Sequence, residues 1–132
     1  MGRASNRGRR RPAPAWRHVS DLPWADFLRA AVERYGRRGQ FWLEHWRGSG
    51  DFVPPRPITS WQIWNEENFF YFTRPASPAR YARLLKISRR PIKGADRRAE
   101  IVIGGLFGNP KGRPPRAMDA VAFLDRLYKA LG

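Results

Sequence analysis

Two short β-prone runs, set among helical patterns, constrain the fold of this 132-residue chain more than any other feature. The first spans residues 58–64 (ITSWQIW), and the second, residues 101–103, is wholly apolar, as in strands buried on both faces of a parallel sheet. The order helix, strand, helix, strand, helix predicts an α/β architecture with parallel strands and right-handed crossovers. Because two parallel strands leave edges exposed and cannot close a barrel, the sequence resembles part of something larger.

Three helices are predicted from apolar side chains at helical spacing. The first begins at residues 20–21, has Pro23 in its first turn and ends at Gly36. The second begins at residues 77–78, and we expect Pro91 to break or kink it because proline lacks the N–H and clashes one turn back. The apolar stripes are Trp24, Phe27, Leu28, Ala31, Val32 and Tyr35, then Tyr81, Leu84, Leu85 and Ser88, and finally Ala120, Leu124, Leu127, Tyr128 and Leu131.

The segments outside these patterns are predicted to be irregular. Residues 1–19 are mostly Arg, Pro, Gly and Ala, which predicts a disordered basic arm before a domain at residues 20–132. Residues 37–57 hold three Gly and three Pro and are predicted to form a long loop, in which Phe41, Trp42 and Trp46 fill a hydrophobic gap.

The net charge of +15, taken alone, favours nucleic acid or an anionic membrane as a partner. However, only four of the 26 basic residues are Lys, and the Arg residues are scattered, as codon bias in a GC-rich genome produces. No apolar run is long enough to span a bilayer. Cysteine is absent, and His18 and His45 have no second ligand at metal spacing, so we predict no metal, no cofactor and no particular compartment.

The candidate catalytic residues lie at the end of the first strand, where Trp64 is followed by Asn65, Glu66, Glu67 and Asn68. Active sites of barrel enzymes form at the carboxyl ends of strands. A carboxyl group there, walled by aromatic rings, is expected to have a raised pKa, because desolvation disfavours its charged form. Strand alternation predicts that Gln62, Trp64 and Glu66 share one face.

This segment resembles the fourth strand of the clan A retaining glycoside hydrolases, in which a strand ending in Trp-Asn-Glu-Pro carries the acid/base glutamate. The resemblance covers about residues 20–132, is nearest to the cellulase-like and family 39 (xylosidase-like) members, and implies an incomplete (β/α)8 TIM-barrel segment. The other matching segments are Arg34-Tyr35-Gly36, Gly39, Phe41-Trp42, Tyr81, Leu84-Leu85, Ile92-Lys93, Ala95-Asp96, residues 101–106 (IVIGGL), Phe123-Leu124 and Leu127-Tyr128.

The resemblance implies a role for each residue of the strand end. Glu66 would be the general acid/base, and Asn65 would hydrogen-bond the hydroxyl beside the reacting carbon of the sugar. Trp64 and Trp61 would lie at or under the sugar. The sequence departs from the family at Glu67, where the family has Pro, and this second carboxylate would raise the pKa of the acid further or point into solvent.

Retaining hydrolysis needs two carboxyl groups about 5 Å apart. In the family the nucleophile arises from the seventh strand, and no acid in this sequence is placed to replace it. Asp96 and Glu100 precede the second strand, and Asp119 and Asp125 belong to an outer helix. We therefore expect a glycoside hydrolase fragment, specific for an oligo- or polysaccharide of unspecified linkage, that shows no activity by itself.

Two other functions stay open on the sequence. A basic nucleic-acid-binding module would use the arm together with Arg89-Arg90 and Arg97-Arg98 against phosphates, although no RNA-binding motif or recognition helix supports it. A non-catalytic carbohydrate binder would use the tryptophan rings to contact a sugar but would not hydrolyse it.

Overall fold

The computed structural model describes residues 21–48 and 54–132, and only the backbone of residues 21, 22 and 46–48. The elements in chain order are α1 (Asp21–Tyr35), α2 (Gln40–Gly48), β1 (Ser60–Ile63), α3 (Pro78–Ala95), β2 (Glu100–Ile103) and α4 (Ala120–Leu131). β1 and β2 pair in parallel, with Ser60 opposite Glu100 and Ile63 opposite Ile103. The predicted α/β arrangement with two parallel strands is confirmed, and the predicted basic arm lies outside the described residues.

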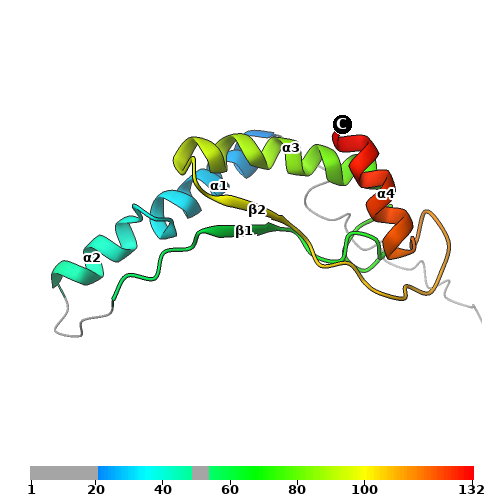
Figure 1. Ribbon diagram of the computed structural model, residues 1–132, viewed down its shortest axis with the longest axis horizontal. Helices are drawn as coiled ribbons and strands as arrows, with labels where there is room; N and C mark the ends of the chain where they lie inside the picture. Colours follow the sequence, from blue (N-terminus) through cyan, green and yellow to red (C-terminus); the bar gives the residue numbers. More distant parts are fainter. Residues whose placement is uncertain (1–20, 49–53) are drawn as a thin grey trace, which may run out of the picture.

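The strand pair is covered on one side only. Figure 1 shows α1 and α3 above β1 and β2, with no element of the described chain below them. The burial pattern agrees, because Ile63 is buried while Gln62 is exposed, and Val102 is 41% exposed. The expected burial of the second strand on both faces is therefore wrong, since the helices cover only one of them.

α1 lies along α3 and packs through the inner part of its predicted stripe. Leu28 and Val32 are buried, and Trp24 Nε1 donates a hydrogen bond of 2.9 Å to Ser88 Oγ. Phe27 is 61% exposed, so its place in the stripe was predicted wrongly. It lies one residue before Leu28 at the edge of the apolar face, where its ring stacks on that of Trp24.

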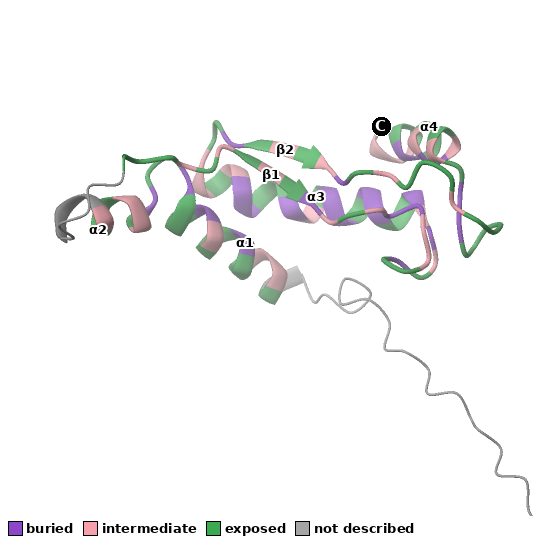
Figure 2. Ribbon diagram, turned by 90° about the horizontal axis from the view of Figure 1, so that it is seen from below, coloured by how far each residue is buried: buried purple, intermediate pink, exposed green. Residues whose placement is uncertain are grey.

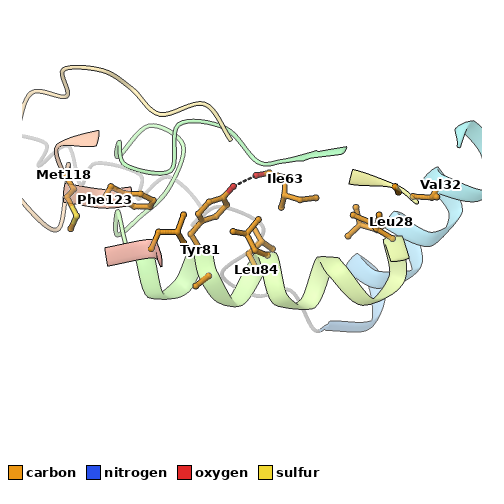
Figure 3. Close-up of a cluster of buried hydrophobic side chains, with 12 residues drawn as sticks. Leu28, Val32, Ile63, Tyr81, Leu84, Met118 and Phe123 are labelled. Atoms are coloured by element: carbon orange, nitrogen blue, oxygen red, sulfur yellow. Dashed lines mark hydrogen bonds between the residues drawn. The ribbon is translucent and has the colours of Figure 1, made fainter. Parts of the chain in front are cut away.

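α3 supplies the central layer of the core (Figure 3). Its predicted inner face is confirmed, because Tyr81, Leu84, Leu85 and Ser88 are all buried. Ser77 caps the amino end by accepting a hydrogen bond from Arg80 N. The helix continues through Pro91 to Ala95, so the predicted break is wrong. Pro91 is itself buried beside Ile92, and this packing offsets the missing backbone hydrogen bond.

α2 contradicts the predicted long loop at residues 37–57. The Gly and Pro residues of that segment lie outside residues 40–47, so nothing in the run QFWLEHWR interrupts a helix. Phe41 and Trp42 are half-buried, and Trp42 Nε1 donates to the Tyr35 carbonyl at the end of α1. The side chain of Trp46, also predicted to fill a gap, lies outside the described residues.

α4 closes the other end of the core (Figures 1 and 3). Asp119 caps the helix by accepting from the backbone N–H groups of Val121 and Ala122. Phe123 and Leu127 are fully buried, whereas Tyr128, predicted in the stripe, is 66% exposed. The buried face is therefore rotated from the predicted one toward Phe123, which contacts Tyr81 at 6.2 Å between ring centroids.

Candidate active-site turn at the carboxyl ends of the strands

A strained turn follows β1. Trp64 and Glu66 have φ values of 67° and 49°, in the left-handed region that side chains other than Gly seldom adopt. Each such residue costs about 1–2 kcal/mol, so the surrounding structure must hold it. The holding contacts are hydrogen bonds from Glu66 N to Gly105 O (2.7 Å) and from Phe69 N to Glu66 O (3.0 Å). The turn is thereby attached to the end of β2.

The strained turn breaks the strand alternation on which the sequence analysis relied. β1 ends at Ile63, and the left-handed backbone at Trp64 redirects the chain. Gln62 is exposed and donates from Nε2 to the Trp64 carbonyl, whereas the Trp64 ring packs against the core. The single face expected for Gln62, Trp64 and Glu66 is therefore not formed.

The two residues after Trp64 lie at the surface of the turn. Asn65 is exposed and Glu66 is half-buried, so a ligand at the carboxyl ends of the strands can reach both side chains. Trp64 is adjacent to them and is oriented by a hydrogen bond of 3.1 Å from its Nε1 to the Phe72 carbonyl. Three of the four predicted site residues therefore belong to one short turn.

Trp61 lies apart from this turn. It pairs with Ile101 in the middle of the sheet and packs against the core on the side of the helices. Its Nε1 is buried and has no hydrogen-bond partner among the described residues. Its position is that of a packing side chain.

Glu67 is buried, in contrast to the face of β1 and β2 that no helix covers, which carries exposed residues (Figure 2). The residue is 1% exposed, and its two carboxyl oxygens have no hydrogen-bond partner in the described part of the chain. The hydroxyl of Tyr81 interacts electrostatically with this carboxyl group, but its single proton is donated to Ile63 O at 2.7 Å (Figure 3). The backbone N–H of Gly104 donates to the Tyr81 oxygen rather than to the carboxyl group.

The pKa of Glu67 is raised from 4.5 to about 7, chiefly by burial, and the nearby charge of Glu66 acts in the same direction. Burial also raises the pKa of Tyr81. The desolvation that the sequence analysis expected at Glu66 therefore acts on its neighbour. No local signal marks Glu67 as the inward residue, because two identical side chains, Glu66 and Glu67, follow the same strand.

Gly104 makes room for this carboxyl group. A Cβ atom at position 104 would lie 2.0 Å from Glu67 Oε1, far inside van der Waals contact. At Gly105 the nearest atom to such a Cβ is Asn65 Oδ1, at 3.9 Å. The first glycine after β2 is therefore required by packing, and the second is not.

Asn68 joins three segments at this end of the molecule, a role that sequence reasoning missed. Its fully buried amide accepts from Phe107 N and donates to the carbonyls of Phe107 and Met118, over distances of 2.8–2.9 Å. Its own carbonyl accepts from Met118 N at 2.9 Å. The turn after β1 is thus fastened to the segment after β2 and to the start of α4.

Within the described ranges, no group of three His, Cys, Asp or Glu side chains is placed to bind a metal ion. The helices described here include none long and apolar enough to cross a membrane. Comparison with protein-family models gives no match to this sequence, and comparison with curated proteins gives no match either.

Proposed function

We propose that this chain is the acid/base segment of a retaining glycoside hydrolase with a (β/α)8 barrel, and that Glu66 is the proton donor. The observation that carries this proposal is the strained, half-buried position of Glu66 directly after a parallel strand. Strain of this kind clusters at functional sites, and barrel enzymes place their catalytic groups at the carboxyl ends of strands.

The two adjacent carboxyl groups have different access, and this favours Glu66 over Glu67 as the acid. A general acid must come within hydrogen-bond distance of the oxygen it protonates. Glu66 is accessible at the surface of the turn, whereas Glu67 is enclosed between Tyr81 and Gly104. Glu67 is therefore not placed to reach the oxygen of a glycosidic bond.

Asn65 and Trp64 complete the proposed site. The exposed amide of Asn65 is free to hydrogen-bond a sugar hydroxyl, and the half-buried indole of Trp64 offers an apolar edge for a sugar ring. Trp61 is left out, because it packs against the core on the side of the helices.

The barrel is proposed from the uncovered face of the strand pair. Each strand has one neighbour in the described chain, and Gln62 and Val102 are exposed on the face away from the helices. In a (β/α)8 barrel this face lines the interior, and both free edges pair with further strands.

Retaining hydrolysis also needs a nucleophilic carboxylate about 5 Å from the acid. Glu67 is enclosed, Glu100 begins β2 at the opposite end of the strands, and Asp119 is occupied as the cap of α4. We therefore expect this chain to release no aglycone from an aryl glycoside in plain buffer.

A replacement nucleophile tests the proposal directly. With azide present, the anion attacks the anomeric carbon, the bond to the aryl oxygen breaks, and Glu66 gives its proton to the departing aryloxide. We expect azide-dependent formation of glycosyl azide, lowered about 100-fold by Glu66→Gln. Glu33→Gln, an exposed carboxylate on α1, is the matched control.

Binding is measured in parallel by NMR titration with neutral xylo- and gluco-oligosaccharides. Trp64→Ala should weaken binding about tenfold through lost ring contact, while Trp42→Ala on α2 should not. Saccharide binding without azide-dependent release would favour the non-catalytic carbohydrate binder. Absence of both would overturn the proposal.

A further inference from the structure

Two arginine side chains converge on one aromatic ring near the candidate site. The guanidinium carbon of Arg74 lies 5.4 Å from the ring centroid of Phe70, and that of Arg116 lies 4.5 Å from it. Arg74 also donates from Nε to the Phe70 carbonyl at 3.2 Å. Neither guanidinium forms an ion pair with a carboxylate of the described residues.

The backbone holds these two arginines together. Arg74 belongs to the segment after β1 and Arg116 to the segment after β2, and Figure 1 shows both segments at the same end of the molecule. Ala76 N donates to Pro115 O at 2.9 Å, and Phe69 forms an antiparallel bridge with Ala117. Two positive charges held close together repel each other, and a bound anion removes that repulsion.

A pocket opens between the two segments. It has a volume of about 360 Å³ and is lined by Phe70, Arg74, Pro75, Pro115 and Arg116. This volume is in the range of small-ligand sites. The pocket offers two cationic groups and an aromatic ring, and none of its lining residues is acidic.

An exposed ring stands beside the pocket. Tyr71 is 64% exposed and stacks on Phe70, with ring centroids 4.5 Å apart and an interplanar angle of 26°. A sugar ring can lie against an exposed aromatic face of this kind. Phe70 itself is covered by the guanidinium groups, so Tyr71 is the ring beside the pocket on which a ligand can stack.

We infer that the pocket between Arg74 and Arg116 binds the carboxylate or sulfate group of an acidic saccharide, with the sugar ring against Tyr71. Planar guanidinium groups match both anions through paired hydrogen bonds. The saccharide part of this inference rests on the proposed function, whereas the anion part rests on two arginines that form no ion pair with the described carboxylates. The site would make the enzyme selective for acidic over neutral chains.

The test compares matched saccharides by isothermal titration calorimetry of the full chain. A uronate oligosaccharide, a sulfated oligosaccharide and a neutral one of equal length are titrated at the same ionic strength. We expect the preferred acidic chain to bind at least about tenfold more tightly than the neutral one. Arg74→Gln and Arg116→Gln should each remove most of this preference, while Arg126→Gln on α4, also exposed, should leave it unchanged.

The outcomes separate this inference from the proposed function. Equal affinity for acidic and neutral saccharides, with Trp64-dependent binding of both, overturns the inference and leaves the proposed function standing. No binding of any saccharide contradicts both. A single-stranded oligonucleotide that competes and depends on Arg74 and Arg116 more strongly than the acidic saccharides do overturns the inference in favour of nucleic acid.

Discussion

The two ends of the β1–β2 pair are built differently. At the amino end, Ser60 Oγ donates to Glu100 Oε2 at 2.7 Å, and Glu100 N donates to Thr59 O, all near solvent. At the carboxyl end, Glu67, Asn68 and Tyr81 are buried together with their polar groups. The same strands thus begin in water and end in a buried polar network.

This difference shows at which end of the strands the molecule buries polar groups at a cost in free energy of folding. A buried polar group costs free energy unless it is hydrogen-bonded, so a network such as that of Asn68 is kept only where position matters. Here it fixes a turn with two left-handed residues. The amino ends of the strands carry no comparable strain, and exposed side chains suffice there.

The largest expected effect comes from removing the buried amide at the carboxyl end. Asn68→Ala leaves three backbone groups of Phe107 and Met118 without their partner, and we expect a loss of about 4 kcal/mol in the free energy of unfolding. Asn65→Ala, on the exposed side of the same turn, should change it by less than about 0.5 kcal/mol. Urea denaturation measures both, and equal effects would abolish the distinction between the two sides of the turn.

The second effect is a pH dependence that belongs to Glu67. Its pKa is about 7 in the folded chain against an ordinary 4.5, so below pH 4.5 both states hold the proton. Between pH 4.5 and 7 the unfolded chain ionises first, and stability falls by about 3 kcal/mol as pH rises, then stays level above pH 7.

Glu67→Gln should therefore remove this fall, and its stability relative to the parent should increase from pH 4.5 to 7. Glu33→Gln, which removes an exposed carboxylate on α1, is the matched control. Urea midpoints measured across pH 4–8 compare the slopes. A parent and Glu67→Gln variant with the same slope would show that the carboxyl group is hydrated in the folded chain.

The third comparison concerns two adjacent glycines. Gly104→Ala places a methyl group 2.0 Å from Glu67 Oε1, and displacing the enclosed carboxyl group should cost about 2 kcal/mol. Gly105→Ala, with 3.9 Å to its nearest atom, should cost much less. Adding Glu67→Ala to Gly104→Ala should recover part of the loss, and a strictly additive double variant would contradict the proposed contact.

The sequence predicted those parts of the fold whose signals are local. Five of the six elements were expected, four of them close to their observed bounds and α3 with a break at Pro91 that does not occur. Apolar spacing over ten or more residues is a strong helix signal, and the strands are bounded by Pro and Gly. α2 was missed because it is only nine residues long and lies among glycines and prolines. Phe123 was missed because which side of α4 faces inward depends on Tyr81, far away in the chain.

The turn residues of the candidate site were predictable, but their orientations were not. Trp64, Asn65 and Glu66 follow a recognisable strand. Which glutamate turns inward depends on the left-handed backbone of Glu66 and on space at Gly104, and neither is visible in local sequence. The partners of Asn68 are 39 and 50 residues away along the chain.

The smallest effect is expected at the amino ends of the strands. It tests the comparison between the two ends of the β1–β2 pair. Ser60→Ala removes the hydrogen bond to Glu100, but both groups are exposed and water replaces it. We expect a change of less than about 0.5 kcal/mol in the free energy of unfolding and no change in saccharide binding. A loss comparable to that of Asn68→Ala would show that stability also depends on the hydrogen bonds at the amino ends of the strands. The two ends would then be alike in this respect, and a stabilising network would no longer distinguish the turn that bears Glu66.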